Sequence, residues 1–396
     1  MCIRDSRSTA QKITTLIEII KHSNETDSPL HLLFVDLKKA YDSVPHEGLW
    51  EALRRLHINE DFIALMKEVY TDNTTAILTP HGPTDKIPVG KGLRQGCPMS
   101  CILFLLFLEP ILTYMEAKAE CTGYKVIRPS AEHANQQGVV MKTLAFADDI
   151  TMLSGTKSAL QCATDTYNSF CRYHSMSMAV DQAGTTLRTK TVYTTNDPSV
   201  PDGESITFVD HANNDKLTTI PRNRADQSYK FLGVHINLEL GWSEQTAVAD
   251  LKVKRYISYM FQRAFTARQC VVAVNRILVP RIAYSMIGAE YDRKTLRAWD
   301  RRAAALINFK LKLPTNRTAA FLHAHESDGG VSLLSFEHTA NALKPFYHHE
   351  ALNSRDQQLR KVSRERRATL QETASRKVKN RGGPQSFAKQ GITIEA

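Results

Sequence analysis

Two kinds of hydrophobic pattern divide the chain. Apolar residues recur at helical spacing in four segments of the first part, which predicts helices over 9–22, 45–56, 59–70 and 157–173. Short apolar or alternating runs predict extended segments over 32–36, 75–89, 143–153, 191–195, 206–209 and 231–236. The first part of the chain therefore mixes helices with strands.

After Trp242 the pattern changes to long helical segments that carry many Lys and Arg residues and continue to Ala351. We expect a second, mostly helical unit there. From Arg355 to Arg381 the chain has ten Lys and Arg residues against three Asp and Glu, with few large apolar residues. This tail cannot build a core of its own.

Composition adds a basic balance to this picture. Of the 396 residues, 51 are Lys or Arg and 41 are Asp or Glu, a formal net charge of +10. That excess suits a polyanionic partner such as nucleic acid, although many basic proteins bind none. The seven cysteines lack the spacing of a zinc site or a disulfide framework.

Neither a signal peptide nor a membrane span is expected. The most apolar run, from Cys101 to Leu112, is short for a span and is interrupted by Glu109 and Pro110. We therefore expect an intracellular protein without a membrane partner.

Candidate chemistry lies in three aspartates. Asp36 ends the run LLFVD, and Asp148 and Asp149 interrupt TLAFADDITML, where a β-hairpin with the pair at its bend is predicted. A carboxylate beside an apolar core is costly without a cation, and adjacent carboxylates repel each other unless a dication lies between them. Mg²⁺ prefers such hard oxygen ligands. The alternative is ordinary turn chemistry, since Asp-Asp turns and strands that end in Asp are common without a metal.

Three motifs resemble those of one family in order and separation. LLFVDLKKAYDSVPHEGLW resembles the first palm motif of reverse transcriptases, GLRQGCPMSCILFLLFLEPIL the motif after it, and LAFADDITMLSG the metal-binding hairpin. Their wording is most similar to non-LTR (LINE-type) retrotransposon enzymes, with group II intron enzymes more distant. SRSTAQKITTLIEII resembles a fingers segment, SYKFLGVHI the primer grip, and LKLPTNRTAAFLHAHESDGGVSLLSF a segment on the thumb side.

The resemblance implies roles for individual residues. Asp36, Asp148 and Asp149 are implied as catalytic ligands of two Mg²⁺ ions, with Mn²⁺ as an alternative, and Tyr41 as the aromatic gate against a ribonucleotide 2′-hydroxyl. It also implies substrate-binding positions and a primer grip: Arg94, Gln95, Gly96 and Lys190 for the former, and Phe231, Leu232 and Gly233 for the latter. The alternative for Arg94 is a solvated loop residue, and the alternative for Lys190 is a solvated strand lysine.

The implied fold is α+β, a reverse-transcriptase palm with an antiparallel sheet and packed helices, partial fingers and a helical thumb. The expected parts, in chain order, are a fingers remnant over 1–30, a palm over 31–240, a helical thumb over 241–351 and a basic flexible tail over 352–396.

The implied activity is RNA-directed DNA polymerisation with an RNA template, a DNA primer and dNTPs. Because LINE-type enzymes copy RNA at a nuclear target, the resemblance implies a nuclear location. The oligomeric state is not predicted. The chain begins after the family's upstream fingers motifs, and MCIRDS does not resemble the family at that place, so we expect an N-terminally truncated polymerase.

Three alternatives remain. One is a truncated or inactive element that retains nucleic-acid binding only. Another is a group II intron-type reverse transcriptase. The third is a different two-metal enzyme, a nuclease or an RNA-templated RNA polymerase, because an acidic cluster alone does not name the reaction.

Overall fold

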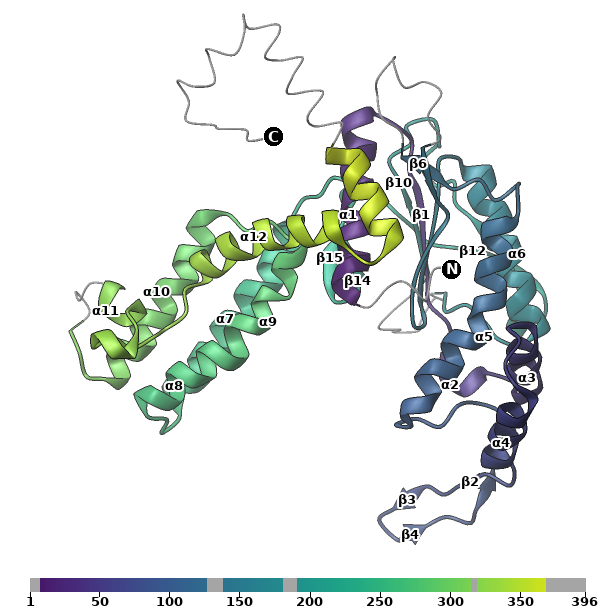
Figure 1. Ribbon diagram of the computed structural model, residues 1–396, viewed down its shortest axis with the longest axis horizontal. Helices are drawn as coiled ribbons and strands as arrows, with labels where there is room; N and C mark the ends of the chain where they lie inside the picture. Colours follow the sequence, from purple (N-terminus) through teal and green to yellow (C-terminus); the bar gives the residue numbers. More distant parts are fainter. Residues whose placement is uncertain (1–7, 127–137, 181–190, 315–318, 368–396) are drawn as a thin grey trace, which may run out of the picture. The chain divides into compact units, whose positions relative to one another are not determined.

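The computed structural model (Figure 1) describes residues 8–126, 138–180, 191–314 and 319–367. These residues form two compact units, one over 22–225 and the other over 8–21 together with 226–367. Helix α1 (Thr9–Thr26) contributes to both.

A five-stranded sheet organises the first unit. Its order is β13 (Arg222–Asn223), β10 (Val192–Thr195), β1 (His31–Val35), β9 (Asp149–Ser154) and β8 (Thr143–Phe146). Neighbouring strands are antiparallel except β10 and β13. Every residue of β1 is buried, as expected for a continuous apolar run at the centre of a sheet.

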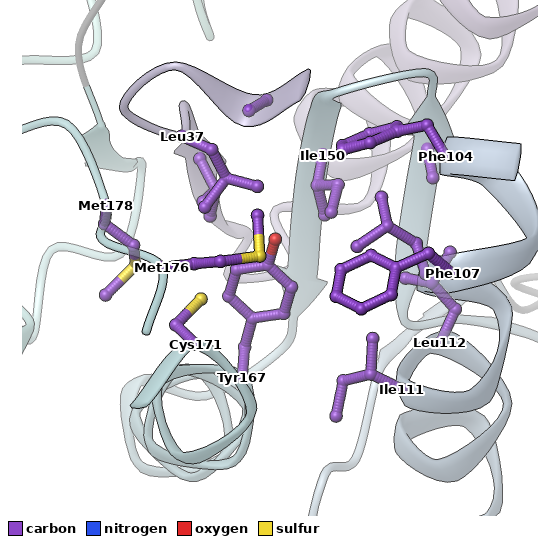
Figure 2. Close-up of a cluster of buried hydrophobic side chains, with 14 of the residues drawn as sticks. Leu37, Phe104, Phe107, Ile111, Leu112, Ile150, Tyr167, Cys171, Met176 and Met178 are labelled. Carbon is purple, nitrogen blue, oxygen red and sulfur yellow. The ribbon is translucent and has the colours of Figure 1, made fainter. Parts of the chain in front are cut away.

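Five further helices belong to this unit: α2 (Ala40–Ser43), α3 (His46–Arg55), α4 (Glu60–Tyr70), α5 (Pro98–Ala117) and α6 (Lys157–Tyr173). Figure 2 shows how α5 and α6 pack against the sheet, with Phe104 and Phe107 of α5 and Tyr167 of α6 around Ile150 of β9. Fully burying an apolar side chain of this size contributes roughly 1.5–3 kcal/mol. Residues adjacent to the candidate aspartates, Val35, Leu37 and Ile150, are part of this apolar cluster.

Helix α5 contains the most apolar run of the chain, from Cys101 to Leu112. It continues for 20 residues through Glu109, which is buried, and Pro110. Packing on both sides of α5 offsets the backbone hydrogen bond that proline cannot donate. Among the described residues, α5 alone is long and apolar enough to cross a membrane, a test that buried core helices also pass, and half of its apolar window is buried.

Short two-stranded pairs complete the first unit. They are β2 (Thr74–Thr75) with β5 (Ile87–Pro88), β3 (Leu78–Thr79) with β4 (Gly82–Pro83), β6 (Tyr124–Val126) with β7 (Val139–Met141), and β11 (Thr207–Asp210) with β12 (Lys216–Thr219). The extended pieces predicted over 75–89 and 206–209 are thereby confirmed.

The second unit is mostly helical, as predicted. Its helices are α7 (Ser243–Gln262), α8 (Ala267–Ala273), α9 (Val279–Ala283), α10 (Arg293–Lys310), α11 (Ala319–His323) and α12 (Phe336–Asn353), with a π-helical turn over Val274–Leu278. A hairpin of β14 (Tyr229–Phe231) and β15 (Val234–Ile236) belongs to the same unit. Its core is centred on Trp299, which is fully buried against Tyr291 and Phe336.

The beginning of the predicted tail is ordered, so the prediction of a flexible tail from 352 was wrong for its first part. Residues 357–367 are helical, with Leu359 and Val362 buried. Asp356 forms a buried ion pair with Lys12 of α1 at 3.5 Å, and Arg366 pairs with Glu18 at 2.6 Å. This segment builds no core of its own but completes one with α1, a partner more than 300 residues away in sequence.

The mixed α+β class is confirmed by the antiparallel sheet with its packed helices and by the separate helical unit. The two units divide between Ala225 and Asp226, which groups the β14–β15 hairpin with the helices. The predicted fingers, palm and thumb boundaries are functional divisions and stay predictions.

Candidate active site

Strand register brings Asp36 and Asp149 together. β1 and β9 are antiparallel neighbours in which Val35 lies opposite Ile150. The same register therefore brings Asp36, which follows Val35, opposite Asp149, which precedes Ile150. Figure 2 shows Leu37 and Ile150 pointing into the same apolar cluster. Because successive side chains alternate between the faces of a strand, Asp36 and Asp149 lie on the opposite face from that cluster.

A tight turn places Asp148 beside them. Phe146 pairs with Asp149 at the end of the β8–β9 hairpin, which leaves Ala147 and Asp148 as the turn residues. The predicted hairpin is confirmed, but its bend lies one residue earlier than predicted, because Asp149 is already the first residue of β9. Ala147 has a φ of 53°, a left-handed conformation that costs a non-glycine residue about 1–2 kcal/mol.

The electrostatics of Asp149 show that the three carboxylates interact. Burial, together with the negative charges of Asp148 and then Asp36, raises the pKa of Asp149 to about 6. The cluster is therefore strained by like charge at neutral pH, and a nearby dication would relieve that repulsion.

The main chain of Asp36 is fixed from the neighbouring segments. Its amide donates to Thr191 Oγ1 at 3.2 Å, and its carbonyl accepts from the Ala179 amide at 2.7 Å. These bonds hold the end of β1 between two segments far along the chain, which limits how far Asp36 can move.

Hard carboxylate oxygens on strand ends are the donor type that Mg²⁺ takes in proteins, so the residues present fit the ion chemically. Within the described residues, however, no three His, Cys, Asp or Glu side chains are arranged so that they hold a metal ion. Joint coordination by the three aspartates stays a prediction.

Tyr41 faces the same site. Its ring stacks on Phe104 of α5, with centroids 4.7 Å apart and 21° between the planes. Burial raises the pKa of Tyr41 to about 12, with contributions from Cys101 and from the charge of Asp148. The hydroxyl thus stays protonated at neutral pH, and the ring is held rigidly near the acidic turn.

The loop over 91–97 is built around Tyr41 and Asp42. The Leu93 amide donates to the Tyr41 carbonyl at 2.8 Å, and Gln95 Nε2 donates to Asp42 Oδ1 at 2.9 Å. Gly96 has a φ of 85° and open space where a Cβ would lie. Gln95 and Gly96 therefore belong to the same local structure as Tyr41.

Arg94 is anchored within the fold. Its guanidinium donates to the Val69 carbonyl at 3.0 Å and to the Asn73 side chain, and it lies 5.9 Å from the ring centroid of Tyr70. These contacts tie the loop to the end of α4. These contacts use guanidinium N–H groups of Arg94 that would also donate to a phosphate. The contact of Arg94 with phosphate stays a prediction.

The residues of the predicted primer grip form the turn of the β14–β15 hairpin in the second unit. Phe231 is buried, and Leu232 and Gly233 have φ values of 46° and 89°. Tyr284 donates its hydroxyl to the Leu232 carbonyl at 2.7 Å, which fixes the turn. Its role at a primer stays a prediction, and Lys190 lies outside the described residues.

Sequence reasoning missed Gly92. It has a φ of 95°, and a Cβ there would lie 2.9 Å from the Asp42 carbonyl oxygen, so only glycine lets the loop pass this close to α2. The glycine that begins GLRQG was the available signal. For Thr191 and Ala179, which hold Asp36, no local signal existed.

Comparison with known proteins gives three findings. A family model described as reverse transcriptase (RNA-dependent DNA polymerase) matches residues 1–236. A Pol polyprotein from a type-1 retrotransposable element R2 of Nasonia vitripennis is 24% identical over 338 residues, covering 83% of this chain and 30% of that protein. That from a type-2 element, R2DM of Drosophila melanogaster, is 20% identical over 335 residues, covering 85% and 29%. The chain thus spans less than a third of the length of these relatives.

Among solved structures, telomerase from Candida albicans in complex with a fragment of telomeric RNA matches with a TM-score of 0.40 and 10% identity, covering 89% of this chain and 51% of that one. Telomerase from Candida tropicalis, also with a telomeric RNA fragment, matches with a TM-score of 0.32 and 14% identity, covering 76% and 50%.

Proposed function

Because the chain belongs to the reverse transcriptase family, we propose that it is the polymerase part of a non-LTR retrotransposon protein and adds dNTPs to a primer 3′-hydroxyl on an RNA template. The sequence similarity to R2 elements supports the assignment to a non-LTR element. The formal net charge of +10 suits nucleic-acid partners.

One observation carries this proposal: three aspartates from two distant segments share one end of the sheet, and their charges act on one another. Reverse transcriptases generally use divalent metals. Two Mg²⁺ ions, or Mn²⁺, would stabilise the charge that develops on the attacking and leaving oxygens. Asp36, Asp148 and Asp149 would hold them.

The other residues have proposed roles around that centre. The Tyr41 ring, held on Phe104, excludes a 2′-hydroxyl and so selects dNTPs. Gln95 and Gly96 contact the incoming nucleotide and template, and Arg94 and Lys190 the phosphates. Phe231, Leu232 and Gly233 position the primer. A nuclear location is proposed from the family resemblance, and imaging of a tagged chain tests it.

Primer extension tests the assignment. The purified chain receives a primed RNA template, dNTPs and Mg²⁺, and Asp148→Ala with Asp149→Ala is expected to lower the extension rate roughly 1,000-fold or more, since metal-assisted charge stabilisation is worth several kcal/mol. The matched control, Asp61→Ala with Asp202→Ala, removes two exposed carboxylates elsewhere and should extend like the parent. If the parent extends the primer, equal extension by the two double variants would refute the site.

A second candidate function is nucleic-acid binding without chemistry. It is favoured by the finding that, in the part of the chain the structure describes, no acidic set is arranged to hold a metal. Titration of an RNA/DNA hybrid beside the extension assay separates the two, because a pure binder shows affinity and no extension at any Mg²⁺ or Mn²⁺ concentration.

A further inference from the structure

Two cysteines face each other between the α5–β6 loop and helix α6. The sulfurs of Cys121 and Cys162 are 3.7 Å apart although the residues are 41 positions apart in sequence. A disulfide needs a sulfur separation of about 2 Å, so the pair must approach by only about 1.7 Å. Of the six cysteines that the structure describes, these two alone lie within hydrogen-bonding distance of another sulfur.

One of the two sulfurs is accessible. Cys162 is partly exposed and lines a groove of about 1060 Å³ between α3, α5 and α6, whereas Cys121 is 3% exposed. A small oxidant can therefore reach Cys162 through the groove, whereas Cys121 is buried next to Cys162. That is the arrangement of a reactive cysteine with a resolving partner.

A cation lies beside the pair. Lys118 Nζ donates to Thr166 Oγ1 at 3.0 Å, and that hydroxyl lies 4.0 Å from Cys121 Sγ. Although burial acts to lower the pKa of Lys118, the net shift is upward, because Cys162 and Cys121 and then other anionic groups, including Glu120, favour its charged form. By the same interaction the ammonium acts to lower the pKa of the Cys121 thiol.

Burial raises the pKa of the Cys121 thiol, and its contact with Cys162 raises it further. The buried thiol is thus harder to ionise, which favours Cys162 as the first sulfur to react. Cys121 then acts as the resolving thiol.

We propose that Cys121 and Cys162 form a reversible disulfide when the folded chain meets a peroxide-class oxidant. The Cys162 thiolate attacks one peroxide oxygen, the O–O bond breaks, and a sulfenic acid forms as the other oxygen leaves and takes a proton to become water (with H₂O₂). The Cys121 sulfur then attacks the Cys162 sulfur, the S–O bond breaks, and the departing hydroxide takes the Cys121 proton as a second water. Two thiols are oxidised and one peroxide is reduced.

The bond closes a loop that contains the acidic hairpin. Residues 121–162 include β6, β7, β8 and β9, and therefore Asp148 and Asp149. A covalent tie at the ends of this segment restricts its unfolded ensemble. The site is independent of the proposed polymerase activity, because its chemistry requires neither a nucleic acid nor a metal.

Oxidation followed by peptide mapping tests the proposal. The reduced full chain is treated with H₂O₂, quenched, alkylated with N-ethylmaleimide and digested without reductant. Most molecules are expected to yield a cross-linked peptide pair joining Cys121 to Cys162, and dithiothreitol should restore both alkylated peptides. The proposal is overturned if both cysteines remain alkylated while Cys101, which is exposed, and Cys97 are oxidised in the same sample.

Cysteine variants distinguish a disulfide that the folded structure directs from nonspecific oxidation. Cys121→Ser should leave a Cys162 sulfenic acid that dimedone traps, and Cys162→Ser should give no cross-link. Cys270→Ser, a buried cysteine in the other unit, should cross-link like the parent. The oxidised parent should melt roughly 5–10 °C higher than the reduced chain in the first unit, and Cys121→Ser should not. Cross-linking that is faster in the urea-unfolded chain than in the folded chain would also overturn the proposal.

Discussion

The buried ion pair between Lys12 and Asp356 permits a quantitative test of how the C-terminal segment is held. Both side chains are 1% exposed, with Lys12 Nζ 3.5 Å from Asp356 Oδ2. The other oxygen, Oδ1, accepts from the amides of Gln358 at 2.9 Å and Leu359 at 3.1 Å, which caps the last described helix. Asp356→Ala therefore removes an ionic partner and a helix cap together.

The expected cost follows from these two roles. Removing one partner of a buried ion pair costs about 3–5 kcal/mol, because the remaining charge loses its compensation, and losing an N-cap costs about 1 kcal/mol more. The exposed pair of Glu51 and Arg55 on α3 is the matched comparison, and breaking it should cost about 0.5 kcal/mol. Asp356→Ala should thus lower the free energy of unfolding by about 4–6 kcal/mol.

Urea unfolding measures this cost in the second unit alone. In a Trp50→Phe background the remaining tryptophans, Trp242 and Trp299, both lie in that unit, so their fluorescence reports its unfolding. Asp356→Asn should retain the cap but lose the ionic partner, and Lys12→Met combined with Asp356→Leu should recover most of the stability. A change below about 1 kcal/mol for Asp356→Ala would refute the reasoning.

Three further predictions concern the first unit. Tyr41→Ala should raise ribonucleotide incorporation roughly 10- to 100-fold, because the space for a 2′-hydroxyl opens, and unchanged sugar discrimination in primer extension would remove its gate role. Gly92→Ala should cost about 1–3 kcal/mol, because its Cβ would meet the Asp42 carbonyl, whereas Gly90→Ala, with open space around it, should stay within about 0.5 kcal/mol in the same unfolding assay. Burial lowers the pKa of the His31 imidazole in the folded chain, although the neighbouring Asp197 acts to raise it. The stability that depends on neutral His31 is therefore fully present above the unfolded-state pKa of about 6.5, and it is lost as the pH falls towards the folded-state pKa. The free energy of unfolding should fall between pH 7 and 5 more steeply in the parent than in His31→Gln, and equal slopes would contradict this.

Local pattern sufficed for the elements that hold the candidate site. The bounds of α6 agree with the prediction over 157–173, and the predicted hairpin formed with its bend at Ala147 and Asp148, one residue earlier than expected. These features depend on periodicity and turn chemistry within about 20 residues, which the sequence displays directly. The candidacy of Asp36 and Tyr41 was equally readable, because each lies in a motif next to a predicted strand, and their roles stay predictions.

Tertiary structure decided what depends on partners distant in sequence. Sequence alone does not specify that Val35 pairs with Ile150, that burial and two neighbouring charges raise the pKa of Asp149, or that Cys121 meets Cys162. It also misled in the tail after 352, where packing against α1 outweighed local preference. The physical reason is the same in each case: burial and charge neighbours are set by contacts between segments that local patterns do not record.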